Sequence, residues 1–401
     1  MTPVSKEWGF RMTASPDPRE WHFEQGPIRP PNEAASLLLR ITRNCPWNRC
    51  KFCAVYKRRK FSLRTVEEIK GDIRAVRAIV DDIRATSESI GAGGAINASV
   101  ANHIFQREDL SERYKRVAVW LYYDTGACFL QDADNLIMKT DDLVEILTFL
   151  RETLPQIARV TTYSRSRTVV NKSVDALTRI REAGLDRIHI GMETGYDPLL
   201  KWIQKGVSAE QQVDAGQRVK AAGMELSEYV MPGLGGREMW REHAIETAKT
   251  LNRIDPHFIR LRSLRIPKRA PLFADRKSGD FEMQPDDDLV REIRLFIEAL
   301  EGIHSTLASD HFMNLLEDVS GKLPEDKDKI LGVIDDYLNL SETDRRIYRL
   351  GRRAGKFRSV KDLTRNPSDY NHFKEWVEEV TEKKGEAGVE RLIAELVDQY
   401  V

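Results

Sequence analysis

Residues 159–191 read RVTTYSRSRTVVNKSVDALTRIREAGLDRIHIG, and the fold assignment starts from this segment. The stretches 159–163 (RVTTY) and 187–191 (RIHIG) are strand candidates, because they are short and rich in β-branched residues. Residues 174–183 between them form a helix candidate, and Gly184 behind it suits a left-handed C-terminal cap. A strand, a helix and a second strand in this order predict a βαβ unit with parallel strands and a right-handed crossover.

The same alternation continues on both sides of this unit. Further strands are expected at residues 35–42, 127–131, 226–231 and 258–264, and helices at residues 65–83, 112–123, 141–153, 209–222 and 240–252. Six βα steps are too few for a closed eight-stranded barrel, so we expect an α/β fold built on a partial (β/α)6 TIM-like barrel, with a doubly wound sheet as the alternative. In both arrangements the functional loops gather at the carboxyl ends of the strands.

Composition changes at both ends of this barrel pattern, which covers residues 35–275. Residues 1–34 are rich in Pro and charge and are expected to form an irregular lead-in. Residues 276–401 are highly charged, with helices expected at 285–300, 329–338, 342–350 and 370–400. We expect this helical C-terminal extension to cover the barrel or to extend its cleft. Residues 86–102 are rich in Gly, Ala, Ser and Asn and should form a flexible loop or a loose helix end.

The composition excludes several classes of protein. Of the 401 residues 41% are hydrophobic and 31% charged, which is typical of a globular protein. Lys plus Arg and Asp plus Glu both number 63, so the formal net charge is +0 and the electrostatic footprint of a nucleic-acid-binding protein is absent from the composition. The first 31 residues lack the apolar core of a signal peptide, and no apolar run approaches the roughly 20 residues of a membrane helix. We therefore expect a cytoplasmic protein.

Three of the four cysteines fall in the segment NCPWNRCKFC at residues 44–53. This pattern is not a disulfide framework, so we expect Cys45, Cys50 and Cys53 to be reduced thiolates on one metal centre. Three thiolates on one loop can bind three irons of a cubane cluster and leave the fourth iron open for chemistry. The alternatives are a structural zinc site and unliganded core cysteines. Cys128 lies in an apolar run and should be a small buried hydrophobe.

A cysteine trio just after the first strand of a βα barrel, with the aromatic Phe52 before the last cysteine, resembles the radical S-adenosylmethionine (radical SAM) superfamily. The common spacing in that family is Cys-x3-Cys-x2-Cys, whereas this chain has Cys-x4-Cys-x2-Cys. The resemblance covers residues 35–271 and extends to a branch with Elongator-type proteins, anaerobic coproporphyrinogen oxidase and methylthiotransferases. The segments that carry it are FLQDAD (129–134), GMETG (191–195), KGVS (205–208), YVMPGLGG (229–236) and FIRLR (258–262).

This resemblance implies an enzyme with one [4Fe-4S] cluster on the three cysteines and with S-adenosylmethionine as its second cofactor. In that family the reduced cluster cleaves S-adenosylmethionine and yields a 5′-deoxyadenosyl radical. The expected substrate is an unidentified small molecule rather than a nucleic acid, and the expected electron donor is a protein such as flavodoxin or ferredoxin. The basic run KRRK at residues 57–60 is a candidate contact for that donor or for an anionic substrate. The alternative is a non-catalytic metal- or cluster-binding barrel protein.

The resemblance also implies which residues bind S-adenosylmethionine. Asp132 or Asp134 would accept hydrogen bonds from its amino group, and Gln131 could add a carbonyl. Ser164 and Arg165, just beyond the third strand, would donate to its carboxylate or ribose, since a planar guanidinium suits a carboxylate. For Asp134 the open alternative is a helix N-cap.

Four more residues are candidates for cofactor contacts. Phe52 would flank the adenine, and Gly233 would permit close approach of adenine or ribose. Glu193 would accept hydrogen bonds from the ribose or the substrate, or else pair with a barrel arginine such as Arg260. Arg260 would bind an anionic part of the cofactor or the substrate, or else pair with Glu193 or Glu228.

Overall fold

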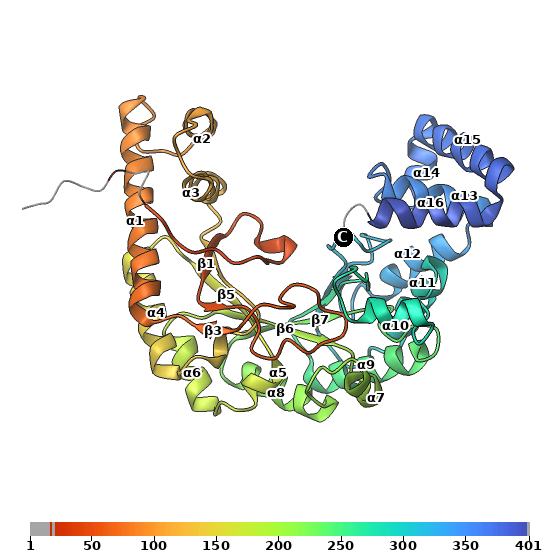
Figure 1. The fold of residues 1–401 in the computed structure, drawn as a ribbon, viewed down its shortest axis with the longest axis horizontal. Coiled ribbons are helices and arrows are strands. Elements are labelled where there is room, and N and C mark those ends of the chain that lie inside the picture. The colour runs from red at the N-terminus through yellow and green to blue at the C-terminus, as the bar shows by residue number, and fades with distance from the viewer. Residues whose placement is uncertain (1–16, 18–20, 399–401) are drawn as a thin grey trace, which may run out of the picture.

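The structure, a computed structural model, describes residue 17 and residues 21–398. At its centre is a curved sheet (Figure 1). In the described part of the chain this sheet has eight strands, in the order β1 (Leu37–Arg40), β4 (Ala127–Gln131), β5 (Arg159–Ser164), β6 (Arg187–Glu193), β7 (Glu225–Val230), β8 (Phe258–Leu261), β9 (Thr306–Ala308) and β10 (Gly321–Lys322). Neighbours from β1 to β9 pair in parallel, and β10 pairs antiparallel with β9.

The strand order confirms the expected partial barrel. The six expected strands lie side by side in the order in which the chain forms them. A doubly wound sheet would reverse this order at a switch point, so that alternative is wrong. The sheet also continues beyond the six expected strands, because β9 and β10 follow β8 within the region expected to be helical. With three and two residues these strands are too short to show a periodic sequence pattern.

The expected helices lie between the strands. They are α1 (Val66–Ser89), α3 (Glu112–Tyr123), α4 (Thr140–Thr153), α6 (Val174–Glu182), α8 (Ala209–Ala221) and α9 (Trp240–Ile254). Gly184, behind α6, has a φ angle of +120°, which confirms the expected left-handed cap, and Gly223 behind α8 has the same role with a φ angle of +76°. Shorter helices stand in the loops after β5, β6 and β8: α5 (Ser166–Val169), α7 (Asp197–Trp202) and α10 (Leu272–Ser278).

Two regions differ from the expected helices. The segment at residues 86–102, expected as a flexible loop or a loose helix end, contains the end of α1 and the start of α2 (Ala98–Gln106), so the Gly-rich part between them is only a short turn. The helix expected at residues 370–400 is two helices, α15 (Pro367–Lys384) and α16 (Glu386–Asp398), because Gly385 between them has a φ angle of +64°. The other helices of this region are α11 (Asp286–Glu298), α12 (Lys327–Leu338), α13 (Glu342–Arg353) and α14 (Asp362–Arg365).

Of the lead-in expected at residues 1–34, residues 1–16 and 18–20 lie outside the described residues. The described remainder forms one short 3-10 helix, η2 (Pro31–Glu33). Among the helices that the structure describes, none has both the length and the apolar character needed to cross a membrane.

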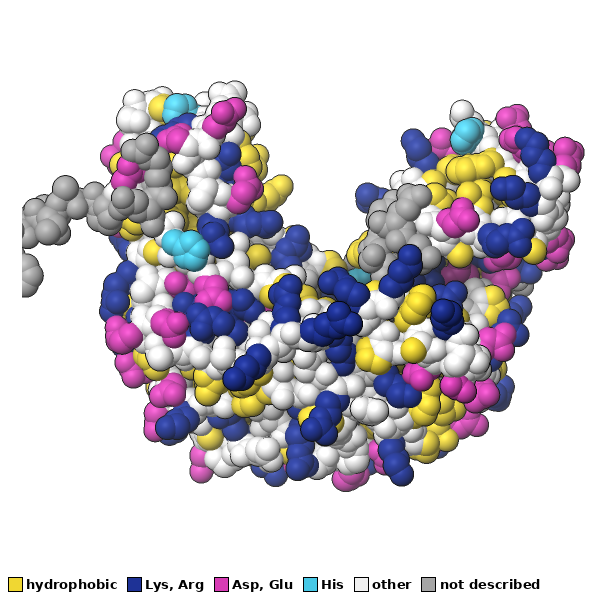
Figure 2. Space-filling model, in the orientation of Figure 1, with side chains coloured by type: hydrophobic (Ala, Val, Ile, Leu, Met, Phe, Trp, Pro, Cys, Tyr) yellow, Lys and Arg dark blue, Asp and Glu magenta, His cyan; other side chains and the backbone are white. Residues whose placement is uncertain are grey.

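The described residues form three clusters of buried apolar side chains, and the two larger ones hold the layers of the fold together. The first lies between the outer face of β1 and β4–β7 and the barrel helices, and Leu37, Val160 and Ile188 belong to it. The second joins β7 and β8 to the C-terminal helices through residues such as Ile259 and Ile334. The C-terminal helices therefore complete the core at one edge of the sheet. Between them and α1–α3 the molecule is hollowed, and many Lys and Arg side chains gather on the face seen there (Figure 2).

Candidate active site

The cysteine loop (residues 44–61) leaves the carboxyl end of β1 and is closed at its base by a short hairpin. In this hairpin β2 (Thr42–Arg43) pairs antiparallel with β3 (Ser62–Leu63). Cys45, Cys50 and Cys53 all lie in the loop as free, half-buried thiols. Cys128 is buried in β4, within the core that faces the barrel helices, as expected for a small hydrophobe.

The three thiols influence one another electrostatically. Burial raises the pKa of Cys50 and of Cys53, neighbouring thiolates add to the rise, and the charge of Lys205 acts against it. In the described residues no three His, Cys, Asp or Glu side chains are placed to hold a single metal ion. A cubane cluster makes a different demand, because each cysteine binds a different iron. Three thiols on one half-buried loop, close to a buried cation, fit an anionic cluster of that kind.

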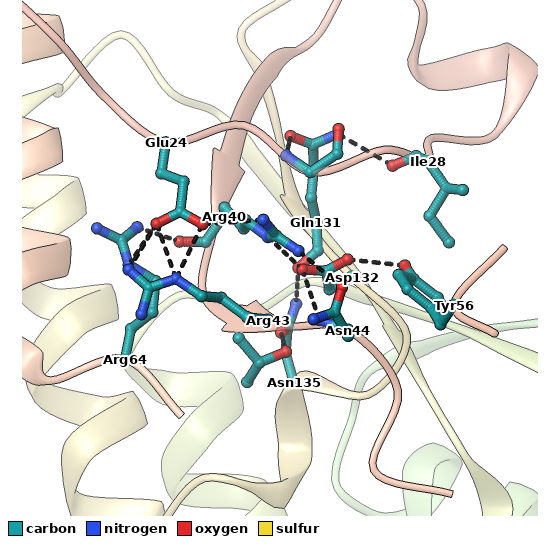
Figure 3. Close-up of polar contacts among 12 residues, drawn as sticks. Glu24, Ile28, Arg40, Arg43, Asn44, Tyr56, Arg64, Gln131, Asp132 and Asn135 are labelled. Atoms are coloured by element: carbon teal, nitrogen blue, oxygen red, sulfur yellow. Dashed lines mark hydrogen bonds and ion pairs between the residues drawn. The ribbon is translucent and has the colours of Figure 1, made fainter. Parts of the chain in front are cut away.

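A buried carboxylate joins the cysteine loop to the end of β4. Asp132 has no exposed surface, and it accepts hydrogen bonds from the backbone N–H of Asn44 at 3.2 Å and from the hydroxyl of Tyr56 at 2.7 Å. It also pairs with the guanidinium of Arg40 (Figure 3). Asn44 precedes the first of the three cysteines and Tyr56 follows the last, so one carboxylate ties down the loop on both sides of the thiols.

Gln131, next to Asp132, holds the N-terminal segment instead of facing the cysteines. Its Oε1 accepts the backbone N–H of Gly26 at 2.8 Å, and its Nε2 donates to the carbonyls of Gly26 and Ile28, both at 3.0 Å (Figure 3). Glu24, in the same segment, pairs with Arg43 at 2.7 Å. The chain just before β1 is therefore fastened to the carboxyl end of the sheet.

Asp134, Ser164 and Arg165 are brought together at the ends of β4 and β5. The carboxylate of Asp134 accepts the hydroxyl of Ser164 at 2.9 Å, the backbone N–H of Arg165 at 3.2 Å and the hydroxyl of Thr168. Burial raises the pKa of Asp134, and these hydrogen bonds act against the rise. Its side chain makes no capping bond to the short helix η3 (Asn135–Ile137) that follows, so the N-cap alternative is wrong.

The other side of the cysteine loop rests on the segment after α7. The indole N–H of Trp47 donates to the carbonyl of Gln204 at 2.7 Å. Gly206 lies so close that a Cβ atom there would be 2.5 Å from the Trp47 ring. The guanidinium carbons of Arg49 and Arg165 lie 4.9 and 5.1 Å from the centroid of the same ring. Because Trp47 lies within the enlarged Cys-x4-Cys segment, the longer loop has its own anchor.

Lys205 places a buried cation next to the cysteine loop. Its Nζ lies 2.9 Å from Oε1 of Glu193 and 5.5 Å from the centroid of the Phe52 ring. Burial works to lower the pKa of Lys205, but the negative charges of Glu193 and Cys50 outweigh it, and the pKa is raised. Glu193 is thus paired with Lys205, and the alternative in which it pairs with Arg260 is wrong.

The structure does not join Arg260 or Gly233 to the cysteine loop. Arg260 on β8 pairs with Asp310 at 2.6 Å, so the alternative pairing with Glu228 is also wrong. Gly233 has a φ angle of +87°, and its N–H donates to the buried carboxyl of Glu292 at 2.8 Å. Burial raises the pKa of Glu292 to about 8.

The sequence did not indicate a role at this site for four residues: Trp47, Tyr56, Thr168 and Lys205. Lys205 alone had a sequence signal, since it opens the KGVS segment that resembles the family. Trp47 and Tyr56 have none, because their partners are 157 and 76 residues away along the chain.

The chain is similar to a known protein family, to a curated protein and to several solved structures. A family model described as the radical SAM superfamily matches residues 39–248. The tRNA uridine(34) acetyltransferase of Methanocaldococcus jannaschii is 29% identical over 63 residues, which are 16% of this chain and 12% of that protein. Elp3 of Methanocaldococcus infernus, with residues 1–46 deleted, aligns with a TM-score of 0.38 and 15% identity over 46% of this chain and 48% of that one. Methylornithine synthase aligns with a TM-score of 0.39 and 15% identity over 68% of this chain and 65% of that one. The chain thus spans a small part of the curated relative and about half of the Elp3 structure.

Proposed function

The chain belongs to the radical SAM superfamily, and from that premise we propose that Cys45, Cys50 and Cys53 hold one [4Fe-4S] cluster whose open iron binds S-adenosylmethionine. Members of this superfamily are enzymes that use these two cofactors. The observation that carries the proposal is the cysteine loop, with three free, half-buried thiols and an anchor on each side. Asp132 fastens one side of the loop, and Trp47 fastens the other.

When bound, the two cofactors supply a 5′-deoxyadenosyl radical. The residues of the chain then have to bind the cofactor and a small substrate, orient them and exclude water. A carboxylate has about four acceptor sites. Asp132 and Asp134 each use three of them for donors of the chain, which leaves one on each for the amino group of S-adenosylmethionine. The carbonyl that Gln131 is proposed to add is that of its backbone, because its side-chain oxygen accepts the N–H of Gly26.

Further residues are proposed as partners of the rest of S-adenosylmethionine. Arg165 would donate to the carboxylate, because only part of its guanidinium is used by the carbonyl of Lys205 at 3.0 Å. Ser164 would support the ribose, together with the second carboxylate oxygen of Glu193. Phe52 is proposed to flank the adenine. Gly233 and Arg260, which the structure does not join to the loop, are proposed to contact the cofactor or substrate from β7 and β8.

We further propose an acidic electron-carrier protein, such as flavodoxin or ferredoxin, as the reductant, and a cytoplasmic location. The support is the basic surface formed by Arg58, Arg59 and Lys60, which are exposed and directly follow the cysteines. Replacing Arg58 and Arg59 with Glu should slow cleavage of S-adenosylmethionine with flavodoxin as reductant. Cleavage with dithionite, which needs no docking, should keep its rate. An equal loss with both reductants would contradict this contact.

The experiment that tests the function is anaerobic. The full chain is reconstituted with iron and sulfide, reduced with dithionite and mixed with S-adenosylmethionine, and 5′-deoxyadenosine is measured by mass spectrometry. Cys45→Ala, Cys50→Ala and Cys53→Ala should each abolish the product, whereas Cys128→Ala, which removes a thiol buried in the core, should retain it. Formation of 5′-deoxyadenosine by any of the three loop variants would contradict the assignment of the cluster to these cysteines.

The same experiment decides the alternative, a non-catalytic metal- or cluster-binding barrel protein. Stoichiometric iron and sulfide without any 5′-deoxyadenosine would support that alternative. Binding of zinc alone would exclude the enzyme and leave a structural metal site.

A further inference from the structure

We propose that Lys205 and Glu193 form a charge pair whose two members act in opposite directions on the reduction potential of the cluster on the cysteine loop. The inference rests on the proposed function, since it needs the cluster to be present. It assigns the pair a tuning role, in which neither residue binds an iron.

The pair lies beside the thiols and is shielded from solvent. The side chains of Lys205 and Glu193 are 10% and 12% exposed, with 2.9 Å between Nζ and Oε1. The ammonium faces the ring of Phe52, the residue just before the last cysteine, at 5.5 Å.

The backbone around this pair is strained at Glu193 and lacks a side chain at Gly191. Glu193, the last residue of β6, has a φ angle of +67°, which is unfavourable for a residue with a side chain. Two residues earlier stands Gly191, where a Cβ atom would lie 2.4 Å from Oε1 of Glu193 and 3.2 Å from Nζ of Lys205. A strained glutamate and a glycine that leaves space for both charges indicate that the chain maintains the pair for a purpose other than packing.

The two charges have opposite effects on a cluster. The reductant transfers one electron to the cluster, so the charge of the cluster becomes one unit more negative. No covalent bond forms or breaks in this step. A nearby cation stabilises the reduced form and raises the potential, and a nearby anion lowers it. Solvent screens charges only weakly in a largely buried site, so both charges act on the cluster. Lys205 and Glu193 together contribute no net charge beside the cluster, so their two effects oppose each other.

The test is an EPR-monitored redox titration of the reconstituted full chain, without S-adenosylmethionine. Lys205→Gln should shift the midpoint potential to a lower value, and Glu193→Gln should shift it to a higher one. The double variant should return close to the wild-type potential, and Lys205→Arg, which keeps the charge, should leave it unchanged. A structural role would not move two variants in opposite directions.

A matched control lies at the other end of the same strands. Arg187 and Glu225 begin β6 and β7 and form an ion pair of 2.6 Å, about 20 Å from Glu193 along β6. Arg187→Gln and Glu225→Gln should leave the potential unchanged.

The outcomes separate this inference from the proposed function. If the wild-type chain assembles no iron and sulfide, the function is wrong, and the inference falls with it. If the cluster forms but Lys205→Gln and Glu193→Gln shift its potential in the same direction, or by no more than the control variants, the inference alone is overturned. If the single variants fail to fold, the double variant and Lys205→Arg decide, because a potential far from the wild-type value in either would also overturn it.

Discussion

The hydroxyl of Tyr56 lies 2.7 Å from the carboxylate of Asp132, and these residues are 76 positions apart in the chain. Tyr56 comes just after the cysteines, and Asp132 directly follows β4. The hydrogen bond therefore ties the cysteine loop to the end of the central sheet. Because Asp132 is fully buried, a lost donor leaves one of its oxygens without a partner.

Tyr56→Phe should loosen the cysteine loop. Leaving a buried acceptor unpaired costs about 1–3 kcal/mol of the free energy of unfolding. We expect a lower urea midpoint and faster release of iron from the reconstituted protein to a chelator. Tyr114→Phe is the matched control, because the hydroxyl of Tyr114 also donates to an aspartate, Asp82, at 2.7 Å. It should lose less stability, because Asp82 is half-buried and water can replace the lost hydroxyl, and it should leave iron release unchanged. Equal iron release by both variants would refute the role of Tyr56.

Gly206→Ala should destabilise the chain more than Gly223→Ala. Both glycines have a φ angle of +76°, so the backbone strain of an alanine, about 1–2 kcal/mol, is shared. At Gly206 the new Cβ also lies 2.5 Å from the Trp47 ring, whereas at Gly223 nothing lies within 4 Å. Urea denaturation should show the difference, and Trp47→Ala in the Gly206→Ala background should remove much of the excess. Equal midpoints for the two glycine variants would show that Trp47 does not rest on Gly206.

Stability should fall between pH 6.5 and pH 8 because of Glu292. Burial raises its pKa from 4.5 to about 8, so over this range the folded chain binds a proton that the unfolded chain has released. His243, which lies 3.4 Å away with its pKa lowered by burial from 6.5 to about 4, has the opposite effect only below pH 6.5. The free energy of unfolding should drop by about 2 kcal/mol. Glu292→Gln should flatten this part of the curve, and parallel curves for both proteins would contradict the assignment.

Asp286→Asn should weaken the contact between the barrel edge and the C-terminal helices. Burial favours the neutral form of Asp286, yet Arg353 and Arg265 outweigh it and lower the pKa to about 2. Removing that charge takes away the carboxylate that pairs with the buried Arg353 at 3.2 Å, which costs about 3–5 kcal/mol. Glu298→Gln on the same helix is the control, since its pair with Arg294 is half-exposed and contributes at most about 1 kcal/mol. Urea midpoints that differ little between the two variants would show that the Asp286 charge is dispensable.

The barrel could be predicted from local patterns in the chain. Strand and helix candidates agree with β1, β4–β8 and their helices, because hydrophobic periodicity and glycine caps act over a few residues. The cysteine trio was visible for the same reason, since Cys45, Cys50 and Cys53 are neighbours in sequence. The strands β9 and β10 were not predicted, because two or three residues carry no period.

Local sequence patterns could not predict which charged residues pair at the site. Glu193 was expected to pair with Arg260 if it paired at all, but it binds Lys205, and Arg260 binds Asp310. Asp132, proposed from the motif as a cofactor ligand, also holds Asn44 and Tyr56. Residue types and their order along the chain follow from the sequence, whereas these partners depend on how the strands align and how the loops fold back over their ends. A buried charge pairs with whatever group that geometry brings within a few ångströms, because in a dry site it cannot remain without a partner.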